Sequence, residues 1–463
     1  MSDQLFAFVV FVLLARLLEP SDIGAFAVML VIAEVFRTLS TAGLVQVVAR
    51  EKALCEEFTD TVYLSHLALS LLAYGLIVAG AHPFARFMGV PEIAVPLQVL
   101  GVTLPISALG LTHMALRLRD FGHRTTALRS VVSGVIAGGA AITAATAGLG
   151  LWALVIQRVL SEVVGVILSR AAYRWTPGRK FRWAILRNNA GLSSSLTATQ
   201  LVFNFTRRLQ ELVIGGVIGM AAVGVYRTAW RTSELIAYGV IRPFTTVAMQ
   251  TLARVKDDPA ELSRAYRWML SRGAVIAFPA LAGFGALAPL AVPTVFGDKW
   301  IEAGPLAQVF AFMALPFTLN FYASPVLGAV GASRSLLAVA IAQLALTALF
   351  TLLAAPYGVL AVAWAYVVRA YLTVPLQITL LKRVSGIGPA STWAAVWEPL
   401  AASTVMCIVL HFGLPMLSSA VSNAWIQLAL ATTFGAIVYV LALSVISPDW
   451  RSFLLRNIER ART

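Results

Sequence analysis

Long apolar stretches recur along the chain, separated by short polar segments. Windows of about 20 apolar residues match the length that an α-helix needs to cross a hydrocarbon core about 30 Å thick. About fourteen such windows are found, which predicts an all-α polytopic membrane protein. They cover residues 5–18, 23–48, 61–81, 93–116, 125–147, 149–168, 190–218, 222–249, 270–292, 305–328, 335–355, 358–380, 393–414 and 425–446.

Composition supports this class. Apolar residues make up 59% of the chain, charged residues only 12%, and the mean hydropathy is +0.83, which excludes an ordinary soluble globular protein. We find no phosphate-binding loop, no zinc motif, and no nucleophile and base at a recognisable spacing. The sequence therefore predicts no catalytic residue, no metal site and no cofactor.

The net charge of +14 follows the predicted topology. Of the 35 Lys and Arg residues, 24 lie in the junctions after even-numbered windows or in the C-terminal tail, and only Arg86 and Lys299 lie in the odd junctions. By the positive-inside rule, the even junctions and both termini are expected in the cytoplasm, with the chain in the cytoplasmic (inner) membrane. The positive charge thus needs no nucleic-acid partner.

An internal repeat organises the chain. The segment ARLLEPSDIGAFAV from Ala15 aligns with GGVIGMAAVGVYRT from Gly215, which pairs Gly24 with Gly224, and Glu34 pairs with Glu234 at the same offset. Windows one to six thus correspond to windows seven to twelve, and a pseudo-two-fold axis along the membrane normal with a central cleft is expected. The predicted organisation is an N-terminal lobe at 1–180, a C-terminal lobe at 181–388, and two further helices with a basic tail at 389–463.

The first window is shorter than its repeat partner, with only 14 apolar residues. An annotated start that lies downstream of the true one is the preferred explanation. A genuinely short or interfacial first segment is the alternative.

Three segments resemble a known family: ARLLEPSDIGAFAV, then TAGLVQVVARE from Thr41, then LVIGGVIG at the end of the charged seventh window. Together with the repeat, they are similar to the polysaccharide transporters. These are the O-antigen and exopolysaccharide flippases of the multidrug/oligosaccharidyl-lipid/polysaccharide superfamily. The resemblance implies movement of a polyprenyl-pyrophosphate-linked oligosaccharide to the outer leaflet by alternating access, for exopolysaccharide or lipopolysaccharide biosynthesis. It also implies membrane lipids as partners, and a polysaccharide polymerase or export machinery as candidate protein partners.

Charges inside the windows are the candidate chemistry. An ionised side chain at the bilayer centre costs about 2.5 to 3.5 kcal/mol, so the nine intramembrane arginines are expected to face a wet cleft or one another. Guanidinium groups bind phosphate through two parallel hydrogen bonds. Seven arginines are therefore predicted to bind the pyrophosphate: Arg207, Arg208, Arg227, Arg231, Arg369, Arg158 and Arg37. The alternative is that each arginine only neutralises a glutamate on its own helix.

Four intramembrane glutamates accompany these arginines: Glu34, Glu234, Glu211 and Glu162. A carboxylate in a low-dielectric cleft is a candidate for coupling to a proton or sodium gradient, and a fixed ion pair that gates one conformation is the alternative. The sequence does not identify the coupling ion, the glycan or the oligomeric state.

Three rival functions remain. A multidrug antiporter of the same superfamily would need an acidic cleft for cationic drugs, and this cleft is predicted to be basic. A lipid II flippase would share the same charge logic and is not excluded. A membrane glycosyltransferase or polysaccharide polymerase is disfavoured because the outer junctions are short. The preferred interpretation is a secondary transporter and not an enzyme.

Overall fold

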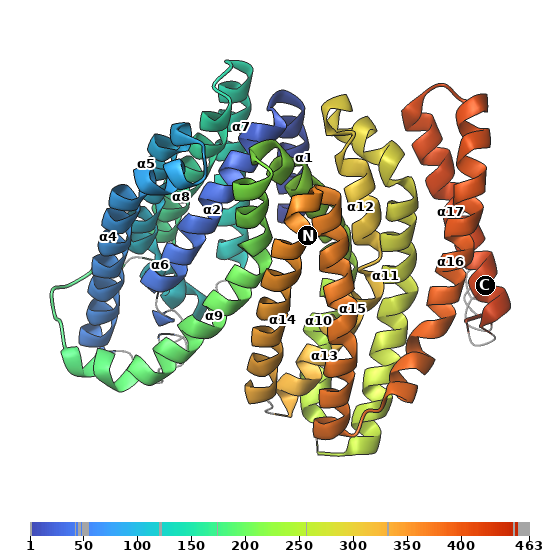
Figure 1. Cartoon of the computed structure of the whole chain (residues 1–463). Coiled ribbons are helices and arrows are strands. Elements are labelled where there is room, and N and C mark those ends of the chain that lie inside the picture. Colours follow the sequence, from blue (N-terminus) through green and yellow to red (C-terminus); the bar gives the residue numbers. More distant parts are fainter. Residues whose placement is uncertain are drawn as a thin grey trace. The chain divides into compact units, whose positions relative to one another are not determined.

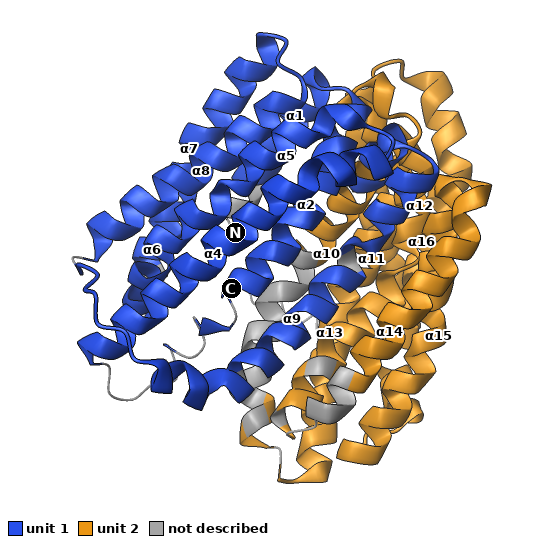
Figure 2. Ribbon diagram, turned by 60° about the vertical axis from the view of Figure 1, so that its left-hand side comes forward, with its two compact units in different colours: residues 1–227 blue, residues 228–463 orange. Residues whose placement is uncertain are grey.

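The computed structural model describes residues 2–41, 43–44, 48, 55–119, 123–173, 175–255, 257–330, 333–447 and 450–451, and within these ranges the chain is helical with no strand (Figure 1). The chain divides into two compact units, residues 1–227 and 228–463, and the boundary falls inside helix α10 (Figure 2). The prediction of an all-α chain is confirmed.

Unit 1 contains α1 (Ser2–Leu17), α2 (Pro20–Thr41), α4 (Glu56–Phe87), η1 (Pro91–Ile93), α5 (Ala94–Gly101), α6 (Thr103–Arg119), α7 (His123–Thr146), α8 (Leu151–Ala172), α9 (Trp183–Val217) and the first eight residues of α10 (Met220–Arg254). Unit 2 contains the rest of α10, α11 (Pro259–Phe296), η2 (Asp298–Trp300), α12 (Ala303–Ala311), α13 (Ala314–Ala329), α14 (Ser333–Ala354), η3 (Ala355–Tyr357), α15 (Val359–Ser385), α16 (Pro389–Ala420) and α17 (Ala424–Ile446).

Ten helical segments of the described chain are long and apolar enough to cross a membrane, and an eleventh results if α12 and α13, bent by 52°, form one span. The protein is therefore a multi-pass membrane protein. Helix α1 is shorter than these spans. Helices α9 and α10, each 35 residues long, are not among the ten, and they contain the charged segments around Arg208 and Arg231.

Two helix boundaries differ from the predicted windows. Helix α2 ends at Thr41, before the predicted end at residue 48, because Gly43 takes a positive φ of 66°, which favours helix termination. Helix α9 begins at Trp183, seven residues before the predicted start at residue 190. The extra turns are polar and exposed, so hydropathy alone did not detect them.

In unit 1, α2 packs between α4, α8 and α9, and α8 also packs on α6 and α7. The starts of α2 and α10 approach so closely that a Cβ on Gly24 would overlap the carbonyl oxygen of Met220. A Cβ on Gly224 would likewise overlap the carbonyl oxygen of Pro20. Only glycine permits this backbone contact.

A polar linker joins α8 to α9 and is fastened to α4. The carboxylate of Asp60 accepts hydrogen bonds from the backbone nitrogens of Gly178 and Lys180, and the Thr61 hydroxyl accepts one from the nitrogen of Arg182. Farther back in the linker, the Trp175 carbonyl oxygen lies 2.9 Å from Nε2 of His113 on α6. The linker therefore determines where α9 starts.

In unit 2, α11 packs against α12, α13, α16 and α17, and α14 packs on α15. Its largest buried cluster centres on Tyr266, Phe278 and Tyr322. A second cluster, which includes Met406 and Tyr439, lies where α16 and α17 meet α11.

Candidate substrate-binding site

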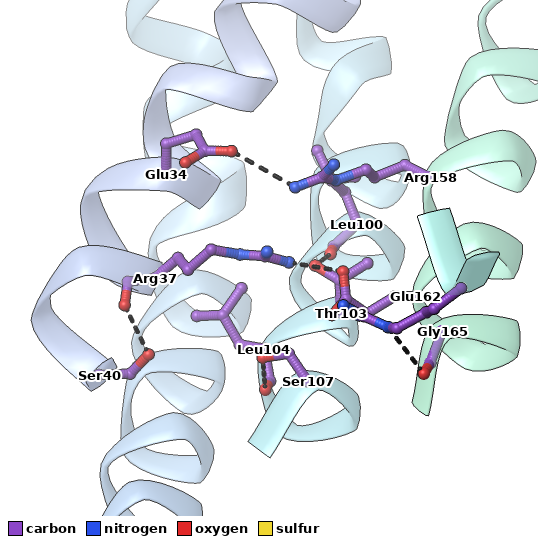
Figure 3. A network of polar contacts seen from close by, with 11 residues as sticks. Glu34, Arg37, Ser40, Leu100, Thr103, Leu104, Ser107, Arg158, Glu162 and Gly165 are labelled. Atoms are coloured by element: carbon purple, nitrogen blue, oxygen red, sulfur yellow. Dashed lines mark hydrogen bonds and ion pairs between the residues drawn. The ribbon is translucent and has the colours of Figure 1, made fainter. Parts of the chain in front are cut away.

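Two reciprocal ion pairs connect α2 to α8 (Figure 3). Nη2 of Arg37 lies 3.0 Å from Oε2 of Glu162, and Nη2 of Arg158 lies 3.4 Å from Oε1 of Glu34. Each helix thus contributes one glutamate and one arginine. Because the order of the pairs is the same along both helices, α2 and α8 run parallel.

Nearby hydroxyl groups leave these charges to one another. Thr38 and Ser40 on α2, and Thr103 and Ser107 on α6, each donate to a backbone carbonyl three or four residues earlier (Figure 3). The Nε of Arg129 on α7 donates to the carbonyl of Gly165 on α8 at 2.9 Å. The four charged groups therefore depend mainly on their ion pairs, which matters because both arginines are partly withdrawn from solvent.

A second cluster surrounds Glu211 on α9. This carboxylate is only 2% exposed and lies 3.2 Å from Nη1 of Arg208 and 3.0 Å from Nη1 of Arg227 on α10. One turn earlier on α9, Nδ2 of Asn204 donates to the Thr38 hydroxyl of α2 at 3.1 Å. Two guanidinium groups thus share one buried carboxylate, on a helix that is also tied to α2.

The alternative of neutralisation within one helix holds only for Arg208, whose partner Glu211 is three residues away. Arg37, Arg158 and Arg227 pair with glutamates on other helices, so for them that alternative was wrong. Sequence spacing could not detect these partners, because they lie on helices that meet only in the tertiary structure. The side chain of Arg207 is outside the described part of the structure.

The described charges of these two clusters do not cancel. Four arginines, Arg37, Arg158, Arg208 and Arg227, are matched by the three glutamates Glu34, Glu162 and Glu211. The surplus positive charge lies at the Glu211 cluster. All four arginines keep between 14% and 33% of their side-chain surface accessible, as expected for groups that border a space open to water or ligand.

In unit 2, Arg369 on α15 is 5% exposed, and its guanidinium carbon lies 4.4 Å from the ring centroid of Tyr366. The Tyr366 ring in turn meets the Trp230 ring edge-on at 5.2 Å. Among the described residues, no carboxylate lies within ion-pair distance of Arg369, and its Nε has no hydrogen-bond partner. The sequence analysis missed both aromatic residues.

The remaining predicted residues, Arg231 and Glu234 on α10, are half-buried. No group of three metal-ligating side chains occurs in the part of the chain that the structure describes. The arrangement around Glu211 can therefore bind an anion through guanidinium groups, and no metal ion is required for this.

Comparison with known proteins agrees with this geometry. The family model described as "Polysaccharide biosynthesis protein" matches residues 13–305. The chain is 26% identical over 462 residues to the succinoglycan biosynthesis transport protein ExoT of Rhizobium meliloti (strain 1021), covering 98% of this chain and 92% of that protein. It is 23% identical over 406 residues to the teichuronic acid biosynthesis protein TuaB of Bacillus subtilis (strain 168), covering 87% and 84% of the two chains.

Among solved structures, the chain is similar to the lipid II flippase MurJ in an inward closed conformation. The TM-score is 0.77 at 13% sequence identity, and the alignment covers 96% of this chain and 97% of that one. This likeness concerns the fold.

Proposed function

Since this chain belongs to the family of polysaccharide biosynthesis proteins, we propose that it is a flippase for polyprenyl-pyrophosphate-linked oligosaccharide. It moves this precursor across the cytoplasmic membrane by alternating access, for the synthesis of a cell-surface polysaccharide. The names of two relatives support this: one is a succinoglycan biosynthesis transport protein and the other a teichuronic acid biosynthesis protein. A polysaccharide polymerase or export machinery is the proposed protein partner.

The proposed architecture has fourteen membrane helices in two six-helix lobes, with two helices added after residue 388. In chain order, α1, the ten apolar spans, the bent α12 and α13 pair, and α9 and α10 correspond to the fourteen predicted windows. The mutual approach of Gly24 and Gly224, which occupy equivalent positions in the repeat, supports a pseudo-two-fold axis near them.

In the proposed topology both termini are cytoplasmic. The parallel direction of α2 and α8 supports it, because both are even-numbered helices in this scheme. The basic linker before α9 and the basic segment before α11 then lie on the cytoplasmic side, as the positive-inside rule requires.

The surplus positive charge around Glu211 is the observation that carries the proposal. A pyrophosphate that enters there would accept hydrogen bonds from Arg208 and Arg227, which already converge on one carboxylate. Glu211 limits the free charge of the empty site, so the two arginines are held ready without strong mutual repulsion. Arg207, Arg231 and Arg369 are proposed to extend the binding surface for the sugar-linked phosphates.

The two α2 to α8 pairs are proposed to hold this part of unit 1 rigid while the substrate binds. In that role Arg37 and Arg158 shape the site, and Glu34 and Glu162 gate it. Glu211 and Glu234 are the proposed groups for ion coupling, because a change in their protonation would change the charge next to the arginines.

The experiment is deletion of the gene in its host, followed by determination of the structure and leaflet of any accumulated polyprenyl-linked saccharide. Complementation uses the wild type, Arg208→Gln, and as a matched control Arg264→Gln, whose exposed side chain pairs only with Glu261. We expect complete repeat units on the cytoplasmic face, cleared by the wild type and by Arg264→Gln but not by Arg208→Gln at equal expression.

Other outcomes would redirect the proposal. A truncated saccharide would indicate a glycosyltransferase, and complete units stranded on the outer face would indicate a polymerase. Accumulation of lipid II would indicate the lipid II flippase alternative, and loss of resistance to cationic drugs without any lipid intermediate would indicate a multidrug antiporter.

A further inference from the structure

An apolar groove of about 640 Å³ lies in unit 1 between α4 and the first half of α9. On α9 its lining runs from Ile185 to Leu201, which is about 24 Å at 1.5 Å per residue. The α4 wall includes Val62, Ala68 and Leu69. This groove is separate from the Arg208 and Glu211 cluster, which lies farther along α9.

The walls of the groove suit hydrocarbon, not sugar. Polar residues that line it direct their hydrogen-bond donors to their own helix. The Ser65 hydroxyl donates to the carbonyl of Thr61, the Thr197 hydroxyl to that of Ser193, and Nδ2 of Asn189 to that of Ile185. These groups are therefore already satisfied, and the surface that remains is almost wholly apolar.

One end of the groove has an aromatic and basic rim, formed by the linker and the first turns of α9. Phe181 and Trp183 line the groove and are 51% and 67% exposed, as is typical of aromatic side chains at a membrane interface. Arg179 and Arg187 are also exposed, and within the described residues neither has a carboxylate at ion-pair distance.

The other two cations of the rim are already neutralised. Nζ of Lys180 lies 2.9 Å from Oε2 of Glu56, and Nη1 of Arg182 lies 3.3 Å from Oε2 of Glu57. The charge available to a ligand is therefore that of the two unpaired arginines. A diphosphate, which carries more than one negative charge, complements it better than a single phosphodiester does.

We propose that this groove is the loading site for the carrier lipid: the isoprenoid chain of a polyprenyl diphosphate lies between α4 and α9, and Arg179 and Arg187 bind its phosphates. This inference rests on the proposed function and adds where the substrate is first bound. Helix α9 supports the assignment, because it leads from the groove at Leu201 to Arg208 in about 10 Å. The same helix thus connects the loading site to the arginines proposed to carry the pyrophosphate.

The test measures binding alone and requires no transport. The full-length protein is placed in phosphatidylcholine nanodiscs and photolabelled with geranylgeranyl diphosphate that carries a diazirine at the tail end. Labelled peptides are identified by mass spectrometry, with unlabelled undecaprenyl diphosphate or phosphatidylglycerol as competitors. We expect label within residues 62–69 and 185–201, displaced by undecaprenyl diphosphate and not by phosphatidylglycerol.

Matched variants sharpen the result. Ala68→Trp fills the groove and should abolish labelling there, whereas Leu71→Trp, on an exposed α4 position outside the lining, should not. Arg187→Gln should weaken binding about tenfold, as expected for the loss of one charge-assisted hydrogen bond. Arg383→Gln, an exposed cation at the end of α15 in unit 2, should leave binding unchanged.

Two results would overturn the inference. Equal displacement by phosphatidylglycerol would identify a general phospholipid site, and label confined to other helices would locate the carrier elsewhere. Both are distinct from failure of the proposed function. Flipping without groove labelling leaves the flippase standing, and groove labelling without flipping leaves a carrier-lipid site on a protein of another function.

Discussion

The carboxylate of Asp60 on α4 accepts a 2.8 Å hydrogen bond from the backbone nitrogen of Gly178, which lies 118 residues later in the linker to α9. The second oxygen accepts from the nitrogen of Lys180 at 3.3 Å, and Asp60 is only 3% exposed. A Cβ at position 178 would overlap this carboxylate. Asp60 and Gly178 therefore hold the linker on α4, and with it the rim of the apolar groove.

Replacing Asp60 with Asn should lower the free energy of unfolding by about 1 to 3 kcal/mol, the usual cost when a buried charged acceptor is lost and a donor is left unpaired. Gly178→Ala should destabilise as well, because the added methyl group displaces the carboxylate. Thermal unfolding of the purified protein in nanodiscs measures both. Asp258→Asn, at the N-cap of α11, is the control and should be close to neutral, since asparagine caps helices as well as aspartate does. Equal melting temperatures for Asp60→Asn and the wild type would show that the linker does not depend on this carboxylate.

The ion pair beside this anchor should matter much less. Glu56 raises the pKa of the exposed Lys180 ammonium through a hydrogen bond and charge attraction. A raised pKa means that the pair stabilises the fold below the ordinary lysine pKa and that this contribution disappears as pH rises through the raised value. At neutral pH the pair is intact but screened by water, so Lys180→Gln should leave the melting temperature nearly unchanged. A melting temperature that falls as far as in Asp60→Asn would contradict this ranking.

The pairs between α2 and α8 should be energetically coupled. Arg37→Gln leaves Glu162 without its partner and should cost about 1 to 2 kcal/mol, less than a fully buried pair because Arg37 is partly exposed. The charge-swapped double variant Arg37→Glu with Glu162→Arg should recover part of this loss. A double-mutant cycle on unfolding measures the coupling, and the exposed Arg264 and Glu261 pair serves as the control. Strictly additive effects at Arg37 and Glu162 would mean that the observed contact contributes nothing.

Glu211 should regulate the affinity of the arginines beside it. Glu211→Gln removes the negative charge shared by Arg208 and Arg227, so binding of polyprenyl diphosphate should become tighter while transport slows. Arg208→Gln should weaken binding about tenfold, and Arg208→Lys should not restore it fully, because lysine lacks the bidentate guanidinium geometry. Calorimetric titration with polyprenyl diphosphate tests all three. If Glu211→Gln and Arg208→Gln change the melting temperature and leave affinity unaltered, the cluster is structural only.

The native cysteines offer a test of topology. Cys55 is exposed just before α4, on the side proposed to be cytoplasmic, and Cys407 is partly buried within α16. A membrane-impermeant maleimide should label Cys55 in everted membrane vesicles and not in right-side-out vesicles. In a Cys55→Ser background, Ala147→Cys, exposed at the turn after α7, should give the opposite pattern. Labelling of Cys55 from the outside would reverse the proposed orientation.

The family resemblance and the membrane class followed from the sequence, and both are confirmed. Hydropathy revealed them because the preference of a 20-residue segment for hydrocarbon is a local property of that segment. The limits of α2 and α9 were predicted less well, since they depend on the positive φ of Gly43 and on a linker that binds to α4. The candidate charges were correctly identified as unusual, but their partners were not.

By itself, then, the sequence determined that this chain is helical, crosses a membrane many times, belongs with polysaccharide transporters, and has more arginine than glutamate within its apolar segments. Only the tertiary structure decided that Glu34 pairs with Arg158, that Arg227 joins Arg208 at Glu211, and that Asp60 binds the linker. The physical reason is range. Transfer into the membrane is summed over neighbouring residues, whereas an ion pair forms between groups brought within about 4 Å, and in a bundle those groups come from helices far apart in the chain.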